Sequence, residues 1–182
     1  MATSLNFDNG IKKIEICNLE GELLTVLKIN TADADTAKKF VELANNLEEI
    51  ANSGEEKAKE CAKKYSEYEK QTFEELPDDI KTGMIVDASN VRIEVLKKMI
   101  AEIDGLFGKD TIHNVFRECY EISEDFVPDE DALIDFVNKV MPVMNDLFDL
   151  RAKAIRKNYN PNRKKHNKTK DELIQEHRKA HE

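Results

Sequence analysis

The densest apolar pattern in the chain lies between Asp79 and Gly108 and repeats with the period of an α-helix. Two adjoining rows of apolar residues follow this period: Met84, Ala88, Val91, Val95 and Met99 in one, and Ile93, Leu96, Ile100 and Ile103 in the other. Two rows form a stripe wider than one neighbouring helix can cover. The pattern therefore predicts a central helix in a helical assembly, with other elements packed along both of its flanks.

The first thirty residues follow a different pattern, in which short runs of aliphatic residues are separated by a turn. The segment Asn18–Gly21 forms that turn, because its glycine can adopt a positive φ. We therefore predict a β-hairpin over residues 11–29. An isolated hairpin is marginally stable in water, so its apolar face must pack on the helices or pair with strands of another subunit. The second alternative would make the hairpin the site of homo-oligomerisation.

Helical patterns occupy most of the remaining chain. The predicted helices cover about 33–52, 55–76, 79–104, 110–120 and 129–158, with a break at Asn52-Ser53-Gly54 between the first two. The 55–76 helix has few large apolar residues, so it is expected to be a largely exposed arm. Pro142 should bend the last helix, because proline removes a backbone donor. The predicted fold is mainly α: a helical bundle with an N-terminal β-hairpin, or α+β.

Charge is distributed unevenly along the chain. The formal net charge is −9, but residues 151–182 carry a net charge of +7, which leaves −16 for residues 1–150. We expect a single domain over residues 1–158, followed by a basic and partly disordered tail over residues 159–182. The tail offers a nucleic acid or an acidic partner the side chains of Arg163, Lys164, Lys165 and Lys168. Tyr159 is the one aromatic residue beside these bases, so stacking on nucleic-acid bases is poorly supported.

The sequence contains no pattern typical of an active site. Glycine-rich nucleotide-binding loops, the GxSxG motif of hydrolases and the HExxH motif of zinc proteases are missing. The three cysteines, Cys17, Cys61 and Cys119, form no CxxC pair and are expected to be free thiols. We therefore expect a protein that is not an enzyme and has no cofactor or metal site. Neither a signal peptide nor a membrane-spanning run is recognisable, so we expect a cytoplasmic location.

The C-terminal half contains a recognisable succession of segments: IDGLFGKDTIHNVFRECY, an acidic loop, and DALIDFVNKVMPVMNDLFDLRAKAIRKNY. It resembles the small tail assembly chaperones encoded by phages and prophages of Gram-positive bacteria, in which an FG-containing turn precedes a short helix, a helix with a central proline and a basic end. The matching positions are Phe107, Gly108, Phe116, Phe136, Pro142 and Arg151. The N-terminal hairpin followed by helices is also similar. The resemblance covers most of residues 11–160, and the 55–76 arm has no clear counterpart.

The resemblance implies a protein that binds the tape measure protein, keeps its apolar helices soluble before assembly and helps to bring tail-tube subunits to it. It implies no catalytic residues, and it places the protein in the cytoplasm of the host cell. An uncovered part of the apolar surface would be the predicted contact. Its candidate partner-binding residues are Val91, Val95, Met99, Phe107, Phe136 and Met144. Two alternatives stay open: a nucleic-acid-binding protein acting through the basic tail, and a structural component of the tail.

Overall fold

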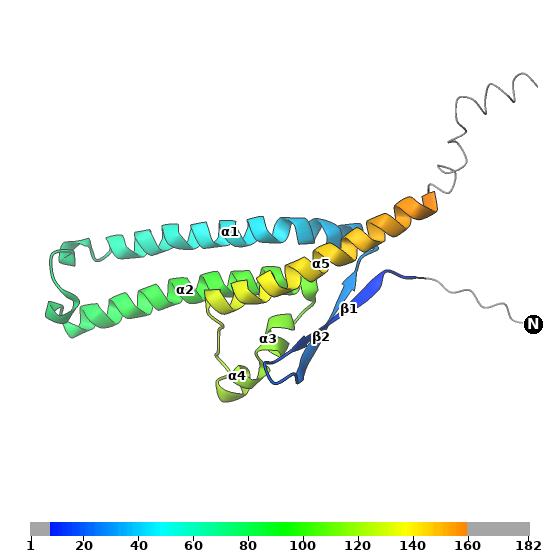
Figure 1. Ribbon diagram of the computed structural model, residues 1–182. Coiled ribbons are helices and arrows are strands. Elements are labelled where there is room, and N and C mark those ends of the chain that lie inside the picture. The colour runs from blue at the N-terminus through cyan, green and yellow to red at the C-terminus, as the bar shows by residue number, and fades with distance from the viewer. Residues whose placement is uncertain (1–7, 160–182) are drawn as a thin grey trace, which may run out of the picture. The chain divides into compact units, whose positions relative to one another are not determined.

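The computed structural model describes residues 8–159 (Figure 1). The chain forms the strands β1 (Ile11–Cys17) and β2 (Leu23–Asn30) and then the helices α1 (Ala34–Lys63), α2 (Asp78–Phe107), α3 (Thr111–Val115), α4 (Arg117–Ile122) and α5 (Glu130–Tyr159). The predicted mainly α fold with an N-terminal β-hairpin is confirmed. The chain divides into two compact units between Val143 and Met144, inside α5 and inside the range predicted as one domain. The basic tail lies outside the described residues.

The N-terminal strands form the predicted antiparallel hairpin. Ile14 pairs with Leu27, and the register is regular as far as Ile16. At the turn, Gly21 has a φ of +85°, which glycine adopts readily because it has no Cβ. Leu27 and Ile29 are buried, and β2 contacts α2 and α3. Within the chain, the apolar face of the hairpin therefore packs on helices.

Helix α1 continues through the segment where the sequence predicted a break. Asp33 caps its start by accepting hydrogen bonds from the backbone N–H groups of Asp35 and Thr36. The hydrogen bond from the Thr36 hydroxyl is the main cause that lowers the pKa of Asp33, and the two backbone bonds add to it. Gly54 is buried inside the helix, and a Cβ built there would lie 2.6 Å from Cγ2 of Val95 in α2. The predicted break at Asn52-Ser53-Gly54 is wrong. Gly54 is needed for close helix packing and does not terminate the helix.

The predicted helix over 55–76 is also wrong in its second half. Helix α1 ends at Lys63, and two 3-10 helices, η1 (Ser66–Tyr68) and η2 (Phe73–Glu75), lead into α2. The Tyr65 hydroxyl donates a hydrogen bond of 3.0 Å to Asp87 of α2, so the chain has already begun to reverse its direction. A continuous helix cannot make that reversal, whatever the helix propensity of its residues.

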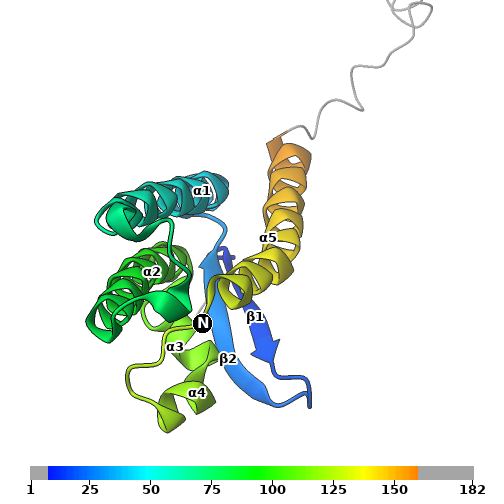
Figure 2. The ribbon, with the colours of Figure 1, turned by 90° about the vertical axis from the view of Figure 1, so that its left-hand side faces the viewer.

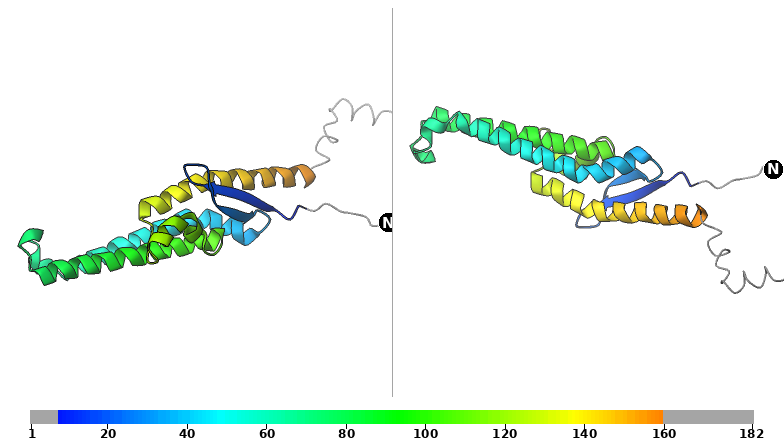
Figure 3. Two further views of the ribbon diagram at one scale, coloured as in Figure 1. Left: turned by 90° about the horizontal axis from the view of Figure 1, so that it is seen from below. Right: turned by 90° about the horizontal axis from the view of Figure 1, so that it is seen from above.

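Helices α1 and α2 lie antiparallel and side by side (Figures 2 and 3). Side-chain contacts define their register: Asn46 with Glu102, Lys57 with Glu94, and Lys64 with Asp87. Helix α2 runs through Gly105 and ends before Gly108, whose φ is +114°. The two helices form a hairpin whose tip is the 3-10 segment.

Burial along α2 differs between its two halves. The buried residues are Leu96, Met99, Ile103 and Phe107, all in the C-terminal half. In the N-terminal half, Ile85 is 56% exposed and Val86 49%, and Ile93, just past the middle of the helix, is 38% exposed. The expectation that other elements pack along both flanks of this helix is therefore wrong for its N-terminal half. Apart from α1 and the segment at the tip, from which Tyr65 bonds to Asp87, neighbouring elements reach only the end nearest the β-hairpin.

The segment after α2 closes that end of the molecule. The Asp104 carboxylate accepts a hydrogen bond of 3.0 Å from the Ile112 backbone N–H, while burial raises the pKa of Asp104. The predicted helix over 110–120 is two short helices, α3 and α4, because the backbone at Phe116 leaves the helical region with φ −104° and ψ 25°. Phe136, in the first part of α5, packs edge-on against Phe107 at a centroid distance of 5.7 Å.

We predict that Gly54→Ala destabilises the protein. Alanine is favoured over glycine in a helix by roughly 1 kcal/mol, but the added methyl group would displace Val95 and separate α1 from α2. Gly105→Ala is the matched control, because it is also helical and a Cβ added there would meet nothing within 4 Å. The control should gain about 0.5–1 kcal/mol in urea unfolding. Equal stabilisation by both substitutions would contradict the close approach.

Candidate partner-binding groove

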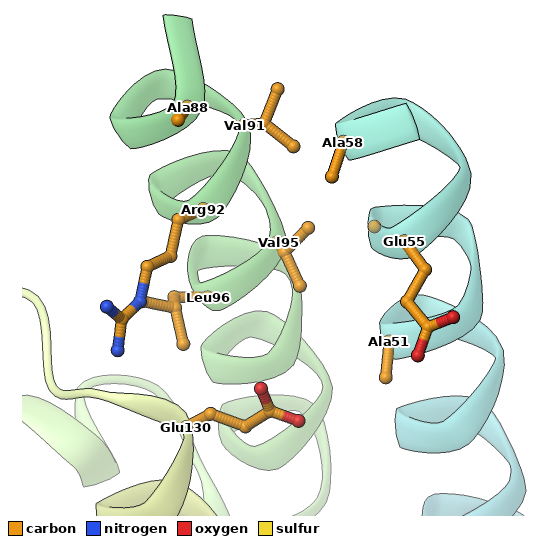
Figure 4. Close-up of a pocket in the computed structure, with 10 residues that line it drawn as sticks. Ala51, Glu55, Ala58, Ala88, Val91, Arg92, Val95, Leu96 and Glu130 are labelled. Atoms are coloured by element: carbon orange, nitrogen blue, oxygen red, sulfur yellow. The ribbon is translucent and has the colours of Figure 1, made fainter. Parts of the chain in front are cut away.

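An apolar groove lies between α1 and α2 beside Gly54 (Figure 4). Its volume is about 250 Å³. The residues that line it are Ala51, Gly54, Glu55 and Ala58 of α1, Ala88, Val91, Arg92, Val95 and Leu96 of α2, and Glu130 at the start of α5. The α1 side is mostly glycine and alanine, so the groove exists because that helix presents few large side chains to it.

A second hollow of about 250 Å³ continues the groove toward the β-hairpin. Its lining combines α1 and α2 with the first turns of α5: Ala44, Leu47, Glu48, Ala51, Met99, Glu130, Leu133, Ile134, Val137 and Asn138. Ala51 and Glu130 line both hollows, so the two adjoin there. Helix α5 begins at Glu130, and its start lies about halfway along the pair of helices α1 and α2 (Figure 3). In the described part of the chain, the groove beyond Glu130 has no covering helix.

The apolar surface extends from the groove along the N-terminal half of α2. Ile85 lies seven residues before Arg92 and eleven before Leu96, so helical spacing places all three in one row. Ile93 and Val86 form the next row and are also exposed. Scattered apolar residues are normal on a protein surface, but these are contiguous with the groove. The groove and this face together form a candidate contact surface for another helix.

The face of the α1–α2 helical hairpin opposite the groove carries charged side chains. Glu94 accepts hydrogen bonds from Lys57 across the hairpin and from Lys98 on its own helix, and these two ammonium groups lower the pKa of Glu94 to about 2. Asp87 accepts a hydrogen bond from Tyr65, which lowers the pKa of Asp87. This side therefore carries paired charges that connect α1 to α2. The groove side carries three carboxylates, of Glu48, Glu55 and Glu130, and the guanidinium of Arg92.

The structure separates the sequence-predicted partner-binding residues into two groups. Val91 and Val95 are half-buried and line the groove. Met99 is 2% exposed, Phe107 5% and Phe136 6%, so these side chains belong to the core of this conformation. Met144 is also buried and belongs to the second compact unit. The predicted basic contacts Arg163, Lys164, Lys165 and Lys168 lie outside the described residues.

Sequence reasoning missed the small residues of the groove. None of Ala51, Gly54, Ala58 and Ala88 was predicted as a contact residue, because small residues add little to an apolar pattern, although Ala88 was counted in an apolar row of α2. The signal was present along α1 and just beyond its end. Steps of three and four residues alternate there across the predicted break, through Phe40, Ala44, Leu47, Ala51, Gly54, Ala58, Cys61 and Tyr65. Such spacing marks a continuous helical seam. Small residues within it mark the place where another helix approaches closely.

The described residues contain no cluster of three or more His, Cys, Asp and Glu side chains suited to a metal ion. Between residues 8 and 159, no helix is long and apolar enough to cross a membrane. The His113 ring stacks on Tyr120 at a centroid distance of 4.4 Å. The thiol of Cys17 is exposed, and those of Cys61 and Cys119 are half-buried.

Comparisons of the chain with protein-family models, with curated proteins and with solved structures found no match. The groove and its surroundings are therefore the basis on which a function is proposed. The groove is an apolar surface between two helices, with carboxylates along its edge.

The contacts of Glu94 predict that the stability of the α1–α2 helical hairpin falls in acid. Because the folded-state pKa of about 2 lies below the ordinary value of 4.5, Glu94 stabilises the fold above pH 4.5, and this contribution is lost as the pH falls toward 2. Glu94→Gln should lower stability at neutral pH and reduce the pH dependence between these values. Urea unfolding at a series of pH values measures both effects, with Glu49→Gln on the exposed surface of α1 as control. A Glu94 carboxyl that titrates near 4.5 by NMR would rule out the contacts.

Proposed function

We propose that the protein is a non-enzymatic assembly chaperone or adaptor that holds an amphipathic helix of a client in the groove between α1 and α2. The observation that carries this proposal is that the first turns of α5 line one of two adjoining hollows and leave the other open. Because the hollow nearer the β-hairpin accommodates the first turns of α5, the open hollow beside it has a suitable shape for a helix of a client. Binding an amphipathic helix in an apolar groove is a recurrent mode of peptide recognition.

The dimensions and side chains of the open end support a helical client. Along α1 the lining of the open hollow runs from Ala51 to Ala58, about 10 Å at 1.5 Å per residue, which matches about two turns of a bound helix. Gly54 and Ala58 allow a client backbone to approach closely, and the exposed Ile85 would add apolar area at the tip end. The excess of carboxylates over guanidinium groups favours a client with basic residues beside its apolar stripe.

The identity of the client rests on the resemblance to phage tail assembly chaperones. On that basis, the client is the tape measure protein, whose apolar helices would be kept soluble in the host cytoplasm before assembly. The tail-tube protein would be a second partner. A chaperone releases its client, so the protein should be missing from finished particles, whereas a structural tail component would be retained in them.

Co-expression with the tape measure protein of the same phage or prophage should raise the soluble yield of that protein and recover the two together. Ala58→Glu in the groove and Ile85→Glu beside it should each reduce recovery of the complex at least tenfold, because a carboxylate would be buried without a partner. Both positions are exposed, so the fold should tolerate these changes. Ile122→Glu in α4 is the matched control, since Ile122 is 88% exposed and lies outside the groove, and it should retain the client.

Two outcomes would count against the proposal. If the two proteins neither purify together nor alter each other's solubility, the chaperone function fails. If the groove variants bind normally and removal of residues 160–182 abolishes binding, the contact belongs to the basic tail. In the second case, salt-dependent binding of DNA or RNA by the intact chain would favour the nucleic-acid alternative.

A further inference from the structure

The outer edge of β1 is the second feature that points to a partner. In the described part of the chain the sheet has two strands, and β1 pairs only with β2. The Gly10 carbonyl accepts a hydrogen bond of 2.9 Å from the Thr31 N–H, and hydrogen-bonding direction alternates along an antiparallel strand. The backbone N–H and C=O groups of Ile11, Lys13 and Glu15 therefore point away from β2, toward the open edge.

The side chains of β1 are also incompletely covered. Its inward row includes Ile14 and Ile16, which are half-buried, whereas Leu27 and Ile29 on the inward row of β2 are 2% and 1% exposed. The border of the core thus runs along β1. A further strand at this edge would satisfy the outward backbone groups and cover the two isoleucines.

We propose that β1 pairs antiparallel with β1 of a second copy of this chain, about a twofold axis at Ile14, to form a four-stranded sheet. Charge complementarity favours β1 of a second copy as the partner strand and also selects the register. With the axis at Ile14, each Lys13 lies opposite Glu15 of the other copy, and the two Ile14 side chains face each other. An axis at Lys13 would oppose two lysines, and one at Glu15 would oppose two glutamates, both of which are destabilising. The Ile14 register also uses the whole length of the strand.

Lys12 lies on the same face of β1 as Ile14, and inward-pointing lysines on edge strands commonly prevent such pairing. Its ammonium lies 3.4 Å from the Asp8 carboxylate, just before the strand begins. In the proposed register its methylene groups, not its charge, would lie beside Ile16 of the second copy. The charges on this strand therefore disfavour the other registers without blocking this one.

Charge reversal tests the register. Lys13→Glu and Glu15→Lys should each raise the dissociation constant of the dimer roughly tenfold or more, because each converts two symmetry-related attractive pairs into repulsive ones. The double variant should restore dimerisation to within a few-fold of the natural chain. Sedimentation equilibrium of the full chain measures all three constants.

The hairpin itself supplies the controls. Lys13 lies opposite Lys28 of β2 in the same chain, so Lys13→Glu removes a like-charge pair within the hairpin and should not weaken its fold. Lys28→Glu makes the same change in net charge on the strand away from the open edge, and it should leave the dissociation constant largely unchanged. In a chain with Cys17, Cys61 and Cys119 replaced by serine, Ile14→Cys should form an intermolecular disulfide on oxidation, because facing residues at a non-hydrogen-bonded pair lie within disulfide reach.

Three results would overturn the proposal: a natural chain that stays monomeric at every accessible concentration, a dimer that tolerates both single reversals, or single reversals that the double variant does not repair. None of these experiments involves a client. Failure of the β1 pairing would therefore leave the proposed groove function untouched, and failure of client binding would leave the β1 pairing untouched.

Discussion

The close approach of α1 and α2 at Gly54 is the constraint on which the first compact unit depends. Because this position has no Cβ, Val95 packs directly against the α1 backbone, and the two helices run side by side. The paired charges at Glu94 connect the helices on one side of this contact. On the other side the same contact creates the groove, since alanines flank Gly54 there. A bulkier residue at position 54 would alter both sides at once.

Two candidate contacts follow, and they rely on different chemistry. The groove offers apolar side chains and suits a helix, whereas the β1 edge offers backbone hydrogen bonds and suits a strand. A dimer joined through β1 would carry two grooves, one in each copy. For a long helical client with several suitable segments, two linked grooves would raise the effective affinity without any new contact in either groove.

Local patterns were sufficient for part of the fold. The β-hairpin was predictable because short aliphatic runs and a turn glycine act over a few residues, and α2 was predictable because its apolar residues are dense and recur at helical spacing. The continuity of α1 was not, since Gly54 has the propensity of a helix stop and becomes favourable only when Val95 fills the space beside it. Val91 and Val95 were predicted as contact residues from their place in the apolar row, but the small residues facing them were not, because their effect depends on the neighbouring helix.

What the sequence by itself determined was the type of most elements and the residues on each helical face, because propensity, periodicity and turn chemistry are local. Only the tertiary structure decided which parts of those faces are covered. Apolar residues occur in both halves of α2, yet Leu96, Ile103 and Phe107 in the C-terminal half are buried while Ile85 and Val86 in the N-terminal half are exposed. The difference arises because α3 and the first turns of α5 reach only one end of α2. Where a neighbouring helix begins is not encoded in the period of the helix it covers.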